Sequence, residues 1–138
     1  MTFRPDSFAA VPVNRFFGFH LQEFDDANAI VRFTPTADHA QEYGVVHGGI
    51  LSALADTSAV YTIRPGLSES DRMTSIEFKI NFLAAAVAGR GDVVSKATLV
   101  RRGRSVAVVR ADVTQGEVHV ATGLFTYIIL SKGVGRSG

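Results

Sequence analysis

The residues best suited to chemistry are His47, Gly48, Gly49 and Asp56. Asp56 lies nine residues after His47 and is the only charged residue between His47 and Arg64. A carboxylate in such an apolar stretch is costly unless it is hydrogen-bonded or used by the protein. The two glycines leave the first backbone N–H groups of a helix open to an approaching negative charge. Together these residues indicate a donor for a developing anion and a carboxylate that acts as base or nucleophile.

Each of these residues also has a structural interpretation that the sequence leaves open. His47 could cap the helix or pack in the core, and the glycines could serve only close packing at the helix start. Asp56 could be satisfied by neighbouring hydroxyl groups such as those of Ser52 or Thr57. The other three histidines stand singly along the chain, without the spacing of metal ligands. We therefore expect a site that uses no metal.

The spacing of Gly48 and Asp56 predicts a site shared by two chains. The two residues are eight positions apart, which is about 12 Å along a helix axis. An oxyanion donor and a base or nucleophile must each lie about 3 Å from the reacting centre. If both residues act, Asp56 must therefore meet Gly48 of a second chain across a two-fold interface.

The elements around this stretch predict an α+β domain. A buried helix runs from Gly48 to Ile63, and it ends where Pro65 and Gly66 follow Arg64. Period-two patterns predict strands at 19–24, 29–33, 74–82, 92–100, 105–114 and 118–130. Ile76, Phe78, Ile80 and Phe82 share one face of their strand, and we expect that face to cover the helix. An antiparallel sheet of about six strands should curl around the single helix and leave surface for another subunit.

Length and composition predict one domain over residues 1–138, with an N-terminal arm (1–17) and a disordered tail (131–138). The chain is 46% hydrophobic, which is enough for a core, and its 14 basic and 13 acidic residues nearly balance. It has no cysteine, no signal-peptide pattern and no run long enough to span a membrane. We expect a cytoplasmic protein that binds neither nucleic acid nor membrane.

The motif Gly44-Val45-Val46-His47-Gly48-Gly49, followed by Leu54-Ala55-Asp56-Thr57, resembles the signature of hotdog-fold acyl-CoA thioesterases of the phenylacetyl-CoA thioesterase (PaaI-like) type. The similarity includes the strand after the helix and the Gly103-Arg104 turn, and it spans roughly residues 18–130. The resemblance implies a hotdog fold and hydrolysis of a CoA thioester without any cofactor besides the CoA of the substrate. It also implies dimers whose sheets join edge to edge, often paired into homotetramers.

The resemblance assigns roles to individual residues. The Gly48 N–H should stabilise the oxyanion, and Asp56 of the partner chain should attack the carbonyl or deprotonate a water that does. An Asn or Gln lies six residues before the histidine in this family, and Gln41 holds that position here. Gln41 should position the water or the carboxylate, while Gly49 and His47 lie next to the thioester. The combination of Gln41 and Asp56 joins residues that are typical of two different branches of the family. The substrate of neither branch can therefore be assigned directly to this chain.

Substrate contacts are also expected outside the helix. Arg102, Gly103 and Arg104 belong to a basic turn that could bind the CoA phosphates or could be only a solvated hairpin tip. Ser75 falls near the site in this family, and Tyr61, Phe78 and Phe82 are candidates for the acyl pocket. The acyl group can be aryl, short-chain or medium-chain. The alternative function is a non-catalytic module that binds acyl-CoA or an acyl carrier; a hotdog dehydratase would need a differently placed histidine.

Overall fold

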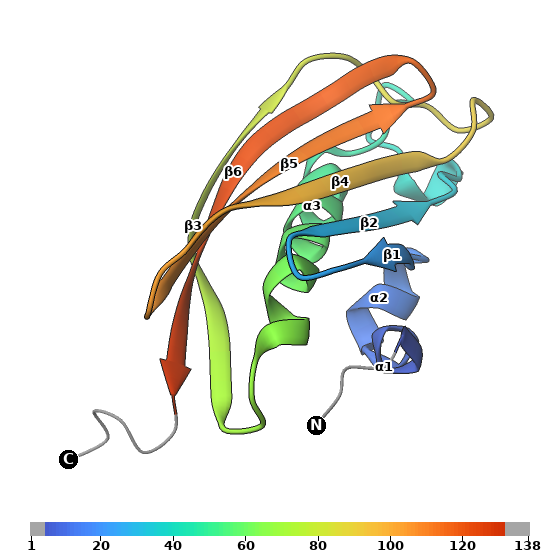
Figure 1. Cartoon of the computed structure of the whole chain (residues 1–138). Helices are drawn as coiled ribbons and strands as arrows, with labels where there is room; N and C mark the ends of the chain where they lie inside the picture. Colours follow the sequence, from blue (N-terminus) through green and yellow to red (C-terminus); the bar gives the residue numbers. More distant parts are fainter. Residues whose placement is uncertain (1–4, 132–138) are drawn as a thin grey trace.

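The computed structural model describes residues 5–131, which form a curved antiparallel sheet wrapped around one long helix (Figure 1). The strands follow the order β1-β2-β4-β5-β6-β3 across the sheet. They are β1 (His20–Phe24), β2 (Asn28–Phe33), β3 (Asp71–Phe82), β4 (Val93–Arg102), β5 (Val106–Gln115) and β6 (Val118–Ser131). The helices are α1 (Pro5–Ala10), α2 (Pro12–Phe17) and α3 (Gly48–Ile63), with 3-10 turns η1 (Ala37–His39) and η2 (Arg64–Gly66). The predicted α+β class is confirmed.

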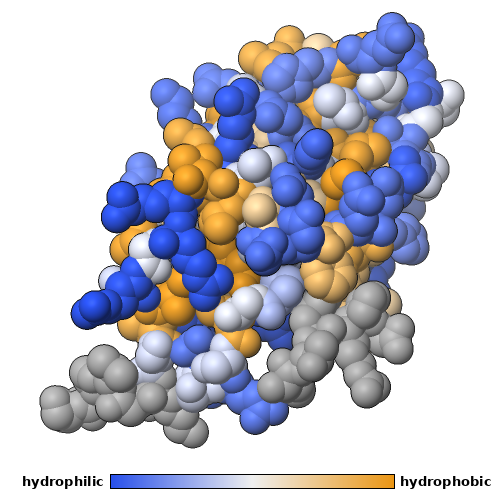
Figure 2. Space-filling view, viewed as in Figure 1, coloured by the Kyte–Doolittle hydropathy of each residue, from blue (hydrophilic) through white to orange (hydrophobic). Residues whose placement is uncertain are grey.

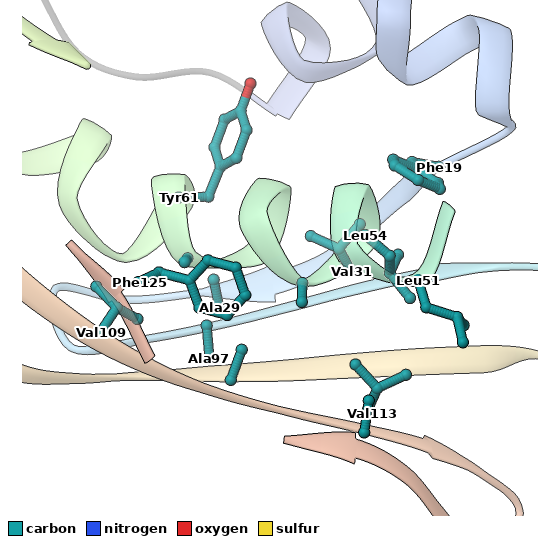
Figure 3. Packing of buried hydrophobic residues seen from close by; sticks show 14 of the residues in the cluster. Phe19, Ala29, Val31, Leu51, Leu54, Tyr61, Ala97, Val109, Val113 and Phe125 are labelled. Atoms are coloured by element: carbon teal, nitrogen blue, oxygen red, sulfur yellow. The ribbon is translucent and has the colours of Figure 1, made fainter. Parts of the chain in front are cut away.

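Helix α3 lies against the concave face of the sheet and has the bounds that the sequence predicted. It packs mainly on β2, β4 and β5. Figure 3 shows Leu54 among the apolar side chains that these strands turn toward the helix, including Val31, Ala97 and Val109. These four side chains are fully buried, so the core fixes the position of the residues that α3 carries.

Strand β3 is an edge strand, so its apolar face meets α3 at the N-terminus of the helix, where Phe82 lies over Gly48, and does not cover the whole helix as expected. It pairs only with β6, at the far side of the sheet from β1. Ile76, Phe78 and Phe82 are 55%, 46% and 52% exposed. Sequence patterning identified an apolar face correctly, but strand order decides what that face meets. Figure 2 shows apolar side chains between hydrophilic borders on the side of the molecule where β3 and β6 lie.

A β-bulge interrupts the alternation predicted for β3. The register with β6 shifts between Ser75 and Glu77, so Ile76 is the extra residue. Ser75 pairs with Tyr127 and Phe78 pairs with Phe125, and the Phe78 and Phe125 rings stack with centroids 5.2 Å apart. Because directly paired residues share a face of the sheet, Ser75 takes the place on the concave face that the simple period-two pattern gave to Ile76.

The predicted N-terminal arm contains two short helices where the structure describes it. Phe8 of α1 is buried against Tyr61 of α3, with ring centroids 4.8 Å apart. Asn14 of α2 is also buried and donates a hydrogen bond to the Phe8 carbonyl. At the other end of the chain, Ser131 still belongs to β6, and residues 132–138 of the predicted tail lie outside the described residues. No helix among the described residues is long and apolar enough to cross a membrane.

Candidate active site

The N-terminus of α3 presents one free backbone donor. His47 is the N-cap, and its Nδ1 atom accepts a hydrogen bond from the Gly49 N–H at 2.8 Å. The His47 carbonyl accepts from the Ile50 and Leu51 N–H groups. Within residues 5–131 the Gly48 N–H makes no hydrogen bond. The structural interpretation of His47 as a cap is therefore correct, and its capping bond leaves Gly48 as the available donor at the positive end of the helix dipole.

An open, mostly apolar pocket of about 420 Å³ lies beside Gly48. Its wall combines the loop before α3 with the end of β3 and the loop that follows it. The lining residues are Gln41, Val45, Val46, Gly48, Leu51, Phe82, Leu83, Ala84, Ala85 and Ala86. The Phe82 ring stands over Gly48, since a Cβ atom built on Gly48 would lie 3.1 Å from Phe82 Cζ. The structure thus brings together the predicted residues Gln41, Gly48 and Phe82.

Gln41 is held by the tight loop that leads into α3. Its N–H donates to the Val45 carbonyl at 2.8 Å, and its own carbonyl accepts from Gly44 at 2.9 Å. Gly44 adopts φ +84, a conformation that favours glycine. The Gln41 Oε1 atom accepts from the Tyr43 N–H, and its NH₂ group makes no hydrogen bond within the described part of the chain. A carboxamide donor is therefore available at the pocket wall.

Gln115 fixes the opposite wall of the pocket, although the sequence gave no reason to single it out. Its side chain is buried. The Nε2 group donates to the carbonyls of Val87 and Gly91, at 2.7 and 2.9 Å, and Oε1 accepts from the Val87 N–H at 3.0 Å. These bonds hold the loop that contains Ala84–Ala86, and Ala86 in turn accepts a hydrogen bond from Val46.

Asp56 lies half-buried in the middle of α3, and its partner comes from β6. The Tyr127 hydroxyl donates to Asp56 Oδ1 at 2.5 Å. Burial raises the pKa of Asp56 above its ordinary value, while the hydrogen bond from Tyr127 partly offsets that rise. Burial and the neighbouring Asp56 charge raise the pKa of Tyr127 far above its ordinary value. The tyrosine hydroxyl is therefore the donor, and the bond is charge-assisted whenever Asp56 is ionised.

The neighbouring hydroxyls considered for Asp56 do not satisfy it. Ser52 donates instead to the Gly48 carbonyl at 2.8 Å, one turn earlier on α3. Ser75 pairs with Tyr127 across β3 and β6 and shares its face of the sheet. Ser75 is exposed there, so it stands beside the Tyr127–Asp56 pair without closing it off.

The predicted catalytic residues lie in two separate groups within the described chain. Gly48 and Gln41 lie at the N-terminus of α3, and Asp56 with Tyr127 lies eight residues further along the helix, about 12 Å along its axis. Among residues 5–131 no three His, Asp or Glu side chains gather as metal ligands would. The chemistry that these groups can support is carbonyl polarisation at Gly48 and base or nucleophile chemistry at Asp56.

Comparison with known proteins identifies the family. Residues 43–122 match the model of the Thioesterase superfamily. The chain belongs to the thioesterase superfamily. It is a thioester hydrolase with the hotdog fold, and the PaaI-like resemblance predicted from the motif is confirmed.

This thioesterase is similar to proteins from several organisms. A Halobacterium salinarum protein named "putative esterase" is 28% identical over 124 residues, 80% of each chain. A phenylacetic acid degradation-related protein of Ralstonia eutropha is 26% identical, with a TM-score of 0.79 over 86% of this chain and 90% of that one. A thioesterase of Haemophilus influenzae is 20% identical, and its TM-score of 0.86, over 99% of this chain and 96% of that one, shows the same fold.

Other predicted substrate contacts of this thioesterase lie away from the Gly48 pocket. Arg102 is at the C-terminal end of α3, where its Nη1 group donates to the Ile63 carbonyl at 3.4 Å. The Gly103 N–H donates to the Val106 carbonyl at 2.8 Å and closes the turn, while Arg104 is exposed. Tyr61 is buried beneath α1, and Figure 3 shows it pointing away from the sheet toward the N-terminal helices.

Proposed function

We propose that this thioesterase hydrolyses acyl-CoA to a free acid and CoA at sites shared between two chains. The observation that carries the proposal is the free Gly48 N–H, which opens on an apolar pocket at the positive end of α3. A single donor of this kind, aimed at a developing oxyanion, typically contributes about 10²- to 10³-fold to the rate. The half-buried Asp56 supplies the base or nucleophile that thioester hydrolysis also requires.

The proposed reaction begins when the thioester carbonyl oxygen accepts a hydrogen bond from Gly48. The carboxylate of Asp56 in the partner subunit takes a proton from water, and the hydroxide oxygen bonds to the carbonyl carbon. Alternatively, that carboxylate itself bonds to the carbon and gives an anhydride that water then cleaves. In both routes the tetrahedral oxyanion collapses, the carbon–sulfur bond breaks, and the electron pair leaves on the sulfur. A thiol pKa of about 8.5, by analogy with cysteine, means that no strong general acid is needed.

The free edge of β3 supports the two-chain arrangement. An edge strand exposes unpaired backbone donors and acceptors, which a second copy of the strand can satisfy. Phe78 and Phe82 are about half exposed beside that edge, and burying them adds an apolar contribution. We therefore propose a homodimer in which the two sheets are continuous, with pairing of dimers into a homotetramer as a further step.

The proposed substrate has an apolar acyl group. Apart from Gln41 and Gly48, the pocket is lined by aliphatic residues and Phe82. The Ralstonia relative is named for phenylacetic acid degradation, so aryl acyl-CoAs are the first to test, followed by short and medium straight chains. For the CoA phosphates we propose the exposed arginines of the turn, Arg101, Arg102 and Arg104; Arg102 uses one nitrogen for the Ile63 carbonyl and keeps other donors.

Thiol release tests the proposal directly. Free CoA would be followed with a thiol-reactive dye across aryl and straight-chain acyl-CoAs, and the protein adds no background because it has no cysteine. We expect Asp56→Asn to lower kcat by about 10²-fold or more. Asp26→Asn, at an exposed turn position, is the matched control and should behave as the wild type. Saturable binding of acyl-CoA without any thiol release by the wild type would instead favour the non-catalytic binding module.

A further inference from the structure

The two oxygens of the Asp56 carboxylate have different environments. Oδ1 accepts the Tyr127 hydroxyl at 2.5 Å, and the same hydroxyl lies 3.2 Å from the Asp56 carbonyl oxygen. Oδ2 makes no hydrogen bond within residues 5–131. Tyr127 is only 1% exposed, so its ring is held by packing and its hydroxyl has a fixed direction.

Tyr127 is the one ionisable side chain among the described residues that hydrogen-bonds to Asp56. The strands packed on α3 turn apolar or small side chains toward it. On β2 and β4 they include Val31, Phe33, Val93 and Ala97. The Ser95 hydroxyl on β4 is hydrogen-bonded to the Ser58 hydroxyl, with 2.7 Å between the two oxygens. Arg102 binds the carbonyl of Ile63, which lies seven residues after Asp56, about 10 Å along the helix axis.

We propose that Tyr127 is a positioning residue that binds Oδ1 of Asp56 and leaves Oδ2 as the oxygen that reacts. The inference rests on the proposed function and adds the residue that orients its base or nucleophile. One fixed oxygen restricts rotation of the carboxylate, so the free oxygen keeps one direction toward the partner subunit's half of the site. The bond also stabilises the ionised carboxylate against the cost of its burial.

In this proposal Tyr127 does not itself transfer a proton or bond to the substrate. Its hydroxyl is neutral in the working range of pH, because burial and the charge of Asp56 hold its proton. It donates that proton to a hydrogen bond without transferring it. Ser75, which pairs with Tyr127 across β3 and β6, is small and exposed, and we infer that a water or the thioester approaches Oδ2 from this side.

The test uses Tyr127→Phe, which keeps the buried ring and removes only the hydroxyl. Tyr43→Phe is the matched control, since Tyr43 is 82% exposed. The ionisation of Asp56 would be followed by NMR on protein with ¹³C-labelled Asp carboxyl groups, and its signal assigned by its loss in Asp56→Asn. Because the Tyr127 bond lowers the pKa of Asp56, we expect a higher midpoint in Tyr127→Phe and an unchanged one in Tyr43→Phe. Circular dichroism would confirm that both variants are folded.

Kinetics provide the second readout. In Tyr127→Phe we expect kcat at neutral pH to fall by roughly 10-fold, as for loss of one hydrogen bond to a charged group. The acid limb of the plot of kcat against pH should move to higher pH. The difference in kcat between the variant and the wild type should therefore become smaller as pH rises. An unchanged Asp56 titration, or an acid limb that coincides with that of the wild type, would overturn the proposal. Absence of thiol release in the wild type would refute the proposed function instead, and the titration alone would then decide whether Tyr127 controls Asp56.

Discussion

Gly48 is the residue at which the proposed oxyanion donor can be removed with least disturbance. It is the first residue of α3, where proline is tolerated because the N–H has no partner within the helix. His47 before it has φ −60 and ψ 134, an extended conformation that is compatible with a following proline. Gly48→Pro should therefore delete the N–H and leave the helix intact.

The magnitude follows from comparing two substitutions at this position. Both Gly48→Ala and Gly48→Pro add a Cβ atom, which would lie 3.1 Å from Phe82 Cζ and 3.4 Å from the two neighbouring ring carbons. The half-exposed ring can yield by a few tenths of an ångström, so the Cβ atom carries the same small steric penalty in both variants, and proline adds the Cγ and Cδ atoms of its ring. Besides these two ring atoms they differ in the N–H group, which Ala keeps and Pro lacks. We expect kcat of Gly48→Pro to be about 10²- to 10³-fold below that of Gly48→Ala.

The assay is thiol release at saturating acyl-CoA, with the folded fraction of each variant checked by thermal unfolding. A large difference in kcat at similar Tm would support the N–H as the oxyanion donor. Equal kcat values in Gly48→Ala and Gly48→Pro would refute the reasoning, because they would mean that the backbone donor does not act in the rate-limiting step.

Two further predictions concern stability. Burial raises the pKa of Asp56 above its ordinary 3.8, so the folded state binds the proton more tightly and wild-type stability falls as pH rises from about 3.8 through the folded-state pKa. Asp56→Asn should therefore gain in Tm over the wild type across that range, and a Tm difference independent of pH would contradict this. Gln115→Ala removes three hydrogen bonds from the loop beside the pocket. The free energy of unfolding, measured by urea denaturation, should fall by about 2–3 kcal/mol. A change below about 0.5 kcal/mol would show that the loop keeps its conformation without Gln115.

The local signals in the sequence predicted the central helix and the strands beside it. Gly48 and Pro65 mark the helix ends, and apolar periodicity marks the strands, because capping, turn chemistry and side-chain alternation act within a few residues. The hairpin of β1 and β2 is an example. Asp25 Oδ1 accepts hydrogen bonds from the N–H groups of Ala27 and Asn28, each at 2.8 Å, and forms the turn between the strands predicted at 19–24 and 29–33.

Features that depend on distant residues were missed. The sequence placed an apolar face on β3 and expected it to cover the helix, but β3 lies at the edge of the sheet and meets α3 at Gly48 through Phe82. Strand order cannot be deduced from alternation. It considered Ser52 and Thr57 as possible partners of Asp56, whereas the partner is Tyr127, 71 residues away. The alternation of Phe125, Tyr127 and Ile129 puts the tyrosine on one face of β6. Only the packing of β6 beside the middle of α3 reveals that this face meets Asp56.

The shared site is tested most directly by mixing two inactive variants. Asp56→Asn keeps an intact Gly48, and Gly48→Pro keeps an intact Asp56. A mixed dimer therefore has one complete site if each site takes Gly48 from one chain and Asp56 from the other. Co-expression in equal amounts should then restore about a quarter of wild-type thiol release, since half of the dimers are mixed and each has one of its two sites intact. Activity no higher than that of the separate variants, in dimers shown to be mixed, would contradict a site built from two chains.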